Sequence, residues 1–172
     1  LSSWSPYHGS QYAVLSSVAK IVAAGGDYHK IRFTFQEYFR RLGNDPKNWG
    51  EPMAALLGAY SAQMNLSLPS IGGKDSMSGT FQDISVPPML MAFGITTVNA
   101  DTVISPEFKK AKNKLYLIKH TENANYTPNI ECLKKNFDFV STNIENKTIV
   151  SAYALSFGGV IEALAKMSFG NN

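Results

Sequence analysis

Hydrophobic residues recur along the chain at two spacings, and each spacing predicts a different kind of element. Val14, Val18 and Val22 lie four residues apart and predict one face of a helix over about residues 10–24, which Gly25 then ends. Residues 30–35 instead alternate apolar and polar side chains, which is typical of a strand with one buried face. The chain is therefore predicted to begin with a helix followed by a strand.

A second helix is predicted after the turn-rich segment 43–50. Glu51 and Pro52 begin it, and Pro52 is expected in the first turn, where its missing N–H costs least. The helix should end near Asn65 and bury an apolar stripe on one face. That stripe consists of Met53, Leu56, Leu57, Tyr60 and Met64.

The remaining patterns interleave strands with helices. A short strand over 68–71 leads into a glycine-rich loop, and further strands are predicted over 89–98, 114–119 and 147–153. One helix should run from Pro128 to about Glu145 with Thr127 as its N-cap, and a last helix should begin near Gly159. The order predicts an α+β fold, an α/β sandwich, with a boundary between two lobes in the weakly periodic segment 99–113.

Composition narrows the class of protein. With 44% hydrophobic and 12% aromatic residues over 172 positions, the chain is expected to fold around a core. Its formal charge of +3 is scattered, so no nucleic-acid partner is implied, and no apolar run is long enough to cross a membrane. The single cysteine, Cys132, excludes an internal disulfide and favours a reducing compartment. We expect a soluble cytoplasmic protein, and the missing initiator Met suggests a piece of a longer polypeptide.

Two glycine-containing segments are candidate anion sites. In the segment from Gly72 to Gly79, three glycines could expose converging backbone N–H groups, while Lys74 and Ser76 could add charge and a hydroxyl. A plain glycine-rich turn explains this segment equally well. Ser156 lies at a predicted strand-to-helix junction that could hold a phosphate, although an ordinary tight turn fits it better. The three histidines are isolated from one another and predict no metal site.

The segment from Ser70 to Ser78 carries a more specific signal. It contains Gly-Lys-Asp-Ser-Met-Ser, which resembles a signature of phosphoribosylformylglycinamidine synthase, the ATP-dependent amidotransferase of purine synthesis. Residues 5–9, 18–27, 31–39 and 150–159 are also similar to the long bacterial form of this family. The resemblance implies a fold like aminoimidazole ribonucleotide synthetase, with this chain drawn from the second synthase half.

The resemblance also implies an organisation and an activity. Residues 1–105 would form the C-terminal portion of an N-terminal-type lobe, and residues 106–172 would start a C-terminal-type lobe. The parent enzyme would convert formylglycinamide ribonucleotide and glutamine to formylglycinamidine ribonucleotide, using ATP, Mg²⁺, a first synthase half and a glutaminase domain that supplies ammonia. The isolated chain should be inactive and should self-associate. The alternative is a non-catalytic structural half with a degenerate nucleotide site.

The same resemblance implies roles for five residues. Gly72, Gly73, Lys74 and Ser156 would bind nucleotide or phosphate, and Ser76 would bind substrate. The resemblance assigns no catalytic residue.

Several positions depart from the family pattern. Ser16, Lys20 and Ala154 stand where family members carry oxygen ligands for a metal, and Lys74 stands where they carry an Asn ligand. Because an ammonium cannot ligate Mg²⁺, these departures argue against a magnesium site in this half. We expect Lys20 and Lys74 to supply the positive charge near a bound phosphate instead.

Overall fold

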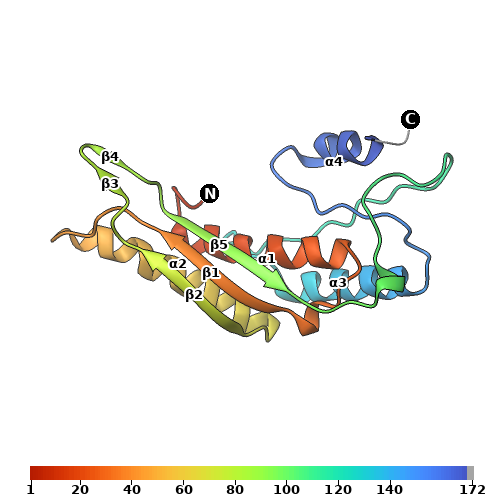
Figure 1. The fold of residues 1–172 in the computed structure, drawn as a ribbon, viewed down its shortest axis with the longest axis horizontal. Coiled ribbons are helices and arrows are strands. Elements are labelled where there is room, and N and C mark those ends of the chain that lie inside the picture. The colour runs from red at the N-terminus through yellow and green to blue at the C-terminus, as the bar shows by residue number, and fades with distance from the viewer. Residues whose placement is uncertain (170–172) are drawn as a thin grey trace.

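The computed structural model describes residues 1–169 and contains both helices and strands, as expected for the predicted α+β class. Three strands form a sheet in the order β2-β1-β5, and two long helices, α1 (Pro6–Ala23) and α2 (Pro46–Leu66), pack on one face of it (Figure 1). The central strand β1 (Arg32–Tyr38) pairs in parallel with β2 (Ser70–Ser76) and antiparallel with β5 (Met89–Ile95). One face of the sheet is therefore covered by helices.

Shorter elements complete the chain. A small hairpin, β3 (Thr80–Phe81) with β4 (Ile84–Ser85), extends beyond the sheet, and the patterns along the sequence did not predict it (Figure 1). Two 3-10 turns, η1 (Tyr28–Lys30) and η2 (Ala100–Thr102), join larger elements. The C-terminal part contains the helices α3 (Ile130–Glu145) and α4 (Gly159–Ser168).

Local capping explains where helices begin. The predicted first helix is confirmed as α1, and it begins earlier than expected because Ser5 is its N-cap and accepts a hydrogen bond from the N–H of His8. The predicted long helix is confirmed as α3, but Asn129 rather than Thr127 is its N-cap, accepting from the N–H of Cys132 at 3.0 Å. The last helix is confirmed as α4.

The second helix differs from its prediction in two respects. Asp45 caps α2 at Pro46, so segment 43–50 is only partly a turn and Pro52 lies inside the helix. The predicted buried stripe is also wrong, because its large side chains are 45 to 60% exposed. The buried face consists instead of Pro52, Ala55, Gly58, Ala59, Ala62 and Leu66.

Close helix packing explains why small residues occupy the buried face of α2. A Cβ added to Gly58 would lie 2.1 Å from the backbone oxygen of Tyr7 on α1, closer than atoms can approach. Because the two backbones approach this closely, large side chains cannot lie between them and instead face solvent. The helix has two apolar faces, and the one with the smaller side chains packs inward.

Two predicted strands are absent from the described residues. Residues 114–119 and 147–153 form no strand in the structure. Each has the β-branched or apolar composition of a strand, but within residues 1–169 neither has a neighbouring strand with which to form a ladder. These two predictions were wrong.

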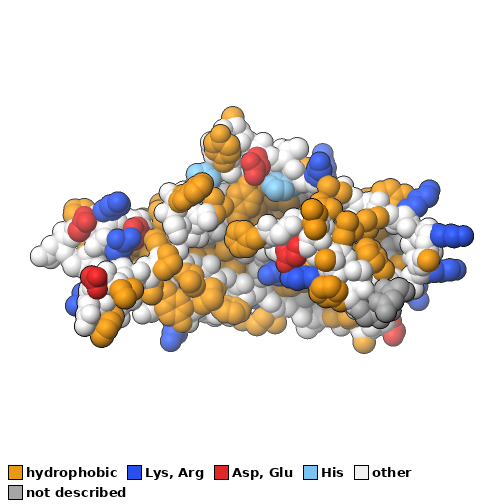
Figure 2. All heavy atoms as spheres, turned by 90° about the horizontal axis from the view of Figure 1, so that it is seen from above, with side chains coloured by type: hydrophobic (Ala, Val, Ile, Leu, Met, Phe, Trp, Pro, Cys, Tyr) orange, Lys and Arg blue, Asp and Glu red, His pale blue; other side chains and the backbone are white. Residues whose placement is uncertain are grey.

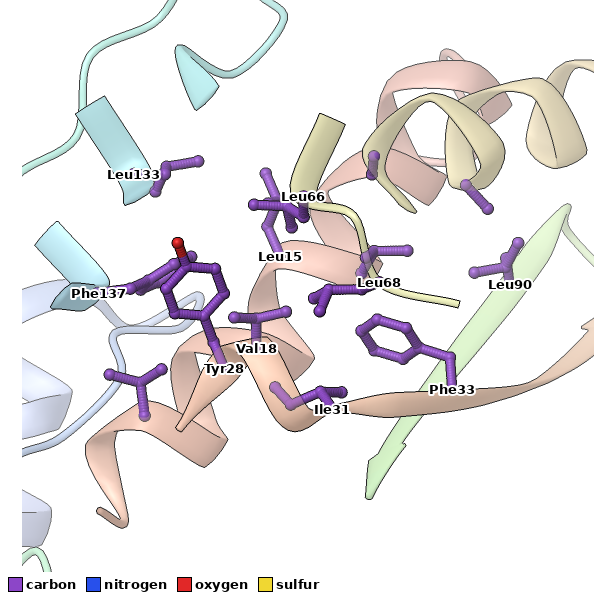
Figure 3. Packing of buried hydrophobic residues seen from close by; sticks show 14 of the residues in the cluster. Leu15, Val18, Tyr28, Ile31, Phe33, Leu66, Leu68, Leu90, Leu133 and Phe137 are labelled. Atoms are coloured by element: carbon purple, nitrogen blue, oxygen red, sulfur yellow. The ribbon is translucent and has the colours of Figure 1, made fainter. Parts of the chain in front are cut away.

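The core lies between the sheet and the two long helices (Figure 3). Phe33 of β1 and Ile31, which directly precedes β1, are fully buried in the same cluster as Val18 of α1. Helix α3 joins the same cluster through Leu133 and Phe137, and the Phe137 ring lies 5.4 Å from the Tyr28 ring. The core therefore includes residues from both sides of position 105, and the proposed division into two lobes stays a prediction.

Hydrophobic side chains are also spread over the surface (Figure 2). Among the described helices, none combines the length and apolar character needed to cross a bilayer.

Candidate functional site

The Gly-Lys-Asp-Ser segment lies in an edge strand rather than in a loop. Gly72, Gly73, Lys74 and Ser76 all belong to β2, whose residues pair one by one with β1 from Thr34 to Tyr38. In an extended strand, successive N–H groups point to alternate edges, so they cannot converge on one anion. The prediction that residues 72–76 form a loop whose N–H groups surround a phosphate is therefore wrong.

One of the two adjacent glycines is explained by packing within the sheet. A Cβ on Gly73 would meet the backbone oxygen of Phe35 at 2.9 Å, whereas a Cβ on Gly72 would meet only the Thr34 hydroxyl, at 3.9 Å. Gly73 thus permits the close approach of β1 and β2 where it pairs with Phe35. This structural role does not require a bound nucleotide.

Strand alternation places Lys74 and Ser76 on the face that the helices leave uncovered. They pair with Gln36 and Tyr38, while the preceding Phe35 lies on the other face and packs against the core. Lys74 is exposed and Ser76 is partly buried. These two candidate side chains therefore share one surface.

The other strands complete that surface, which we call the open sheet face. On β5, Met89, Met91, Phe93 and Ile95 lie opposite the outward-facing residues of β1, and Phe93 and Ile95 are 50% and 57% exposed. The open sheet face thus carries an apolar stripe on β5, a polar stripe on β1 and the Lys74 ammonium on β2. It comprises Thr34, Gln36, Tyr38, Lys74, Ser76, Met89, Met91, Phe93 and Ile95.

Two carboxylates lie together on the opposite, helix-covered face. Glu37 pairs with Asp75 across β1 and β2, and the Oε1 atom of Glu37 is buried without a hydrogen-bond partner among the described residues. Burial, and secondly the charge of Asp75, raises the pKa of Glu37. Glu37 therefore favours its protonated form more than an exposed glutamate does.

The structure places Ser156 in a turn whose hydrogen-bond donors are already used. Its hydroxyl donates to Oε2 of Glu162 at 2.7 Å, and the N–H of Gly158 donates to the same oxygen at 2.9 Å. Hydrogen bonds from Lys166, Ser156 and the Gly158 N–H lower the pKa of Glu162 to about 2. A carboxylate of this chain thus lies where a phosphate was predicted, and a phosphate would have to displace it.

The predicted site residues are brought together only in part. Gly72, Gly73, Lys74 and Ser76 share β2, but Figure 1 shows α4, which follows Ser156, well apart from that strand. Lys20 is exposed on α1, on the helix side of the sheet, so it does not meet Lys74 on the open sheet face. The expectation that these two lysines share one phosphate is therefore wrong.

Metal-binding potential is limited in the part of the chain that the structure describes. There, no three His, Cys, Asp or Glu side chains lie close enough together to hold a metal ion. Ser16 is exposed on α1, and Ala154 carries no polar side-chain atom. Neither position thus supplies a carboxylate ligand, and the absence of magnesium from this half stays a prediction.

A polar contact between distant segments was not predicted from the sequence. The Tyr12 hydroxyl on α1 donates to Oε1 of Glu122 at 3.0 Å, and burial together with Glu122 raises the pKa of Tyr12 to about 12. The two residues are 110 positions apart, so no local pattern could have paired them. This contact lies beside a polar pocket that is described below.

Comparisons with known proteins support the resemblance found in the sequence. No family model matches the chain. The phosphoribosylformylglycinamidine synthase subunit PurL of Pelagibacter ubique is 26% identical over 180 aligned positions, covering 94% of this chain and 24% of the relative. The chain thus spans about a quarter of the length of this relative.

Solved structures show the same fold. Thermotoga maritima PurL complexed with AMPPCP matches with a TM-score of 0.68 at 15% identity, covering 96% of this chain and 27% of that one. The complex of the same protein with ATP gives 0.68 at 14% identity, again over 96% and 27% of the two chains. The chain is therefore similar, over nearly all its length, to a segment of a PurL-like synthase with an aminoimidazole ribonucleotide synthetase-like fold.

Proposed function

We propose that this chain is a segment of a phosphoribosylformylglycinamidine synthase and contributes to that reaction within a longer enzyme. The observation that carries the proposal is the extent of the similarity: 94% of the chain aligns with one PurL subunit, and 96% superposes on another. A domain shared by chance with an unrelated enzyme would not also carry the Gly-Lys-Asp-Ser-Met-Ser signature.

The proposed reaction replaces an amide oxygen by nitrogen. The amide oxygen of formylglycinamide ribonucleotide attacks the γ-phosphorus of ATP, which releases ADP and leaves the oxygen as a phosphate ester. Ammonia from glutamine then adds to the same carbon, and phosphate departs with the oxygen. Catalysis of both steps consists mainly of holding the reactants in position and stabilising the developing charge.

Within that enzyme, we assign the open sheet face to contact with the first synthase half. A contiguous exposed apolar stripe such as Met89, Phe93 and Ile95 is typical of a surface that another protein surface covers. Lys74, on the same face but separated from this stripe by β1, would supply one positive charge to a phosphate group near the junction of the two halves. ATP binding is proposed because PurL structures hold ATP or AMPPCP, while magnesium is proposed only for sites elsewhere in the longer enzyme.

Genetic complementation tests this function. The longer protein that contains this chain should restore growth without added purine to a host that lacks its own synthase, provided that ammonia or a glutaminase partner is supplied. A version lacking residues 1–172 of this chain should not restore growth. If the intact protein is expressed in folded form and growth still requires purine, the proposal is wrong.

A further inference from the structure

A polar pocket lies where the start of α1, the end of α2 and residues 123–131 meet, on the helix side of the sheet. Its volume of about 420 Å³ is within the range of small-molecule sites. Tyr7 and Gln11 line it from α1, and Ser61 and Asn65 line it from α2. The pocket is separate from the open sheet face.

The outer wall of this pocket is fastened to α1. Nε2 of His8 lies 3.0 Å from the backbone oxygen of Asn125, and Tyr12 donates to Glu122 at 3.0 Å. Within the loop, the N–H of Asn123 donates to the oxygen of Thr127 at 2.9 Å. The loop that forms this wall is thus hydrogen-bonded within itself and to His8 and Tyr12 of α1. The pocket is therefore already formed without a ligand.

Gln11 supplies an unused buried amide. The residue is 4% exposed, its Oε1 has no hydrogen-bond partner, and no hydrogen bond among the described residues involves its side chain. A buried polar group without a partner is costly, and the terminal torsion of glutamine is broad enough to present either amide atom to the pocket. A ligand in the pocket could therefore satisfy Gln11.

The asparagines in the pocket leave both donors and acceptors available. Nδ2 of Asn65 donates to the backbone oxygen of Ser61 at 2.8 Å, which leaves its Oδ1 as an acceptor. Oδ1 of Asn125 accepts from Thr127, and Oδ1 of Asn129 accepts from the N–H of Cys132, which leaves the two Nδ2 groups as donors. The residues that line this cavity thus include both free amide donors and free amide acceptors.

The charge of the lining disfavours an anionic ligand. Among the described residues, no Lys, Arg or His lines the pocket, and Glu131 is its single charged side chain. Lys134 contacts Oε1 of Glu131 at 3.3 Å but does not line the pocket. Phosphate groups are bound by cations or clustered N–H donors, so a neutral ligand fits better.

We propose that this pocket binds the neutral ring of a small polyol, such as a furanose or pyranose sugar. Each hydroxyl of such a ring both donates and accepts, which matches a lining that offers amide donors and acceptors from Gln11, Asn65 and Asn129. Ala62 and Ile130 also line the pocket and offer apolar contacts for the carbon atoms of the sugar. Nothing in the proposal depends on the synthase activity.

An NMR titration of the 172-residue chain tests the proposal, with D-ribose as the probe and acetamide and inorganic phosphate as comparison probes. D-ribose should saturably shift the side-chain amide signals of Gln11 and Asn65, whereas phosphate should leave them unchanged. Asn65→Ala should weaken D-ribose binding by roughly two- to tenfold, as expected for one lost neutral hydrogen bond. Gln11→Met, which keeps side-chain length, should weaken it similarly.

Asn143→Ala is the matched control. Asn143 on α3 also donates to the carbonyl four residues before it at 2.8 Å, but it does not line the pocket. This variant should bind D-ribose as the unaltered chain does. Absence of saturable D-ribose shifts, binding of acetamide without D-ribose, or equal weakening by Asn65→Ala and Asn143→Ala would each overturn the proposal.

Discussion

Lys74 lies on the open sheet face, on the edge strand β2, next to Gln36 of the central strand β1. If it meets a phosphate of ATP in the longer enzyme, Lys74→Ala should weaken ATP binding by about 1.5–3 kcal/mol, the usual contribution of a hydrogen bond to a charged group. Calorimetric titration of the longer protein measures this loss. Lys47→Ala, an exposed lysine of α2, should leave binding unchanged.

Chelation of magnesium gives a second result for the same residue. Among the described residues, no three His, Cys, Asp or Glu side chains lie close enough together to hold a metal ion. The part of ATP binding that depends on Lys74 should therefore persist after a chelator removes magnesium from solution. Tight binding that vanishes on chelation and is indifferent to Lys74→Ala would contradict the role proposed for this lysine.

Glu37 should make stability depend on pH. Its pKa is raised by burial and by Asp75, so the native state holds a proton that the unfolded state releases above the ordinary value of 4.5. The contribution of Glu37 to the free energy of unfolding should therefore fall as pH rises from about 4.5 through the folded pKa, and stay low above it. Glu37→Gln should stabilise the chain at pH 7 and lose this advantage near pH 4.

Urea unfolding of the two proteins at both pH values measures the difference. Glu145→Gln, at an exposed glutamate near the end of α3, is the control for replacing a carboxylate that is not buried. An advantage for Glu37→Gln that is equal at pH 4 and pH 7 would show that Glu37 titrates as an exposed residue.

The packing of α2 against α1 yields a prediction about the helix. Gly58→Ala should destabilise the chain by about 1–3 kcal/mol, because the added Cβ would lie 2.1 Å from the Tyr7 backbone oxygen. Gly50→Ala in the same helix meets no atom within 4 Å and should stabilise by about 0.5–1 kcal/mol. Thermal and urea unfolding distinguish the two, and equal effects of both substitutions would show that α2 does not pack as described.

Helices were predictable from sequence where local signals agree. For α1 and α3, hydrophobic spacing determines the element and both helices were predicted, although their N-caps, Ser5 and Asn129, were not. The orientation of α2 was not predictable, because the choice between its two apolar faces depends on how closely α1 approaches Gly58. The expected strands at 114–119 and 147–153 failed for a related reason, since a strand requires a partner that composition does not reveal.

The candidate site was predictable as a motif but not as a geometry. The residues Gly72 to Ser76 were identified from sequence, but glycines that suggest a loop also occur in a strand where a neighbouring backbone approaches closely, as at Gly73. The pairing of Lys74 with Gln36, and the contact of Tyr12 with Glu122, join residues far apart in the chain. Such contacts exist only after folding.

The molecule as a whole exposes an uncovered sheet face, and this predicts self-association of the isolated chain. Phe93 is 50% exposed on that face and lies opposite Thr34 of β1. Light scattering should show dimers or larger species whose population rises with concentration. Phe93→Lys should shift the population toward monomer, because it places a charge within the apolar stripe.

A second exposed apolar surface provides the control for that experiment. Leu57, 45% exposed on the outer face of α2, belongs to the helix side of the molecule. Leu57→Lys should leave self-association unchanged. If it produces monomers and Phe93→Lys does not, the chains associate through α2 rather than through the open sheet face.

The central claim is that this chain is part of a phosphoribosylformylglycinamidine synthase. The most direct test of this claim measures transfer of an isotope label from ammonia to the product. The longer protein, supplied with ATP, formylglycinamide ribonucleotide and a ¹⁵N-labelled ammonia source, should form formylglycinamidine ribonucleotide carrying the label, detected by mass spectrometry. The isolated 172-residue chain should form none, since it spans about a quarter of its PurL relatives. Folded longer protein that binds ATP but transfers no labelled nitrogen to this substrate would contradict the account.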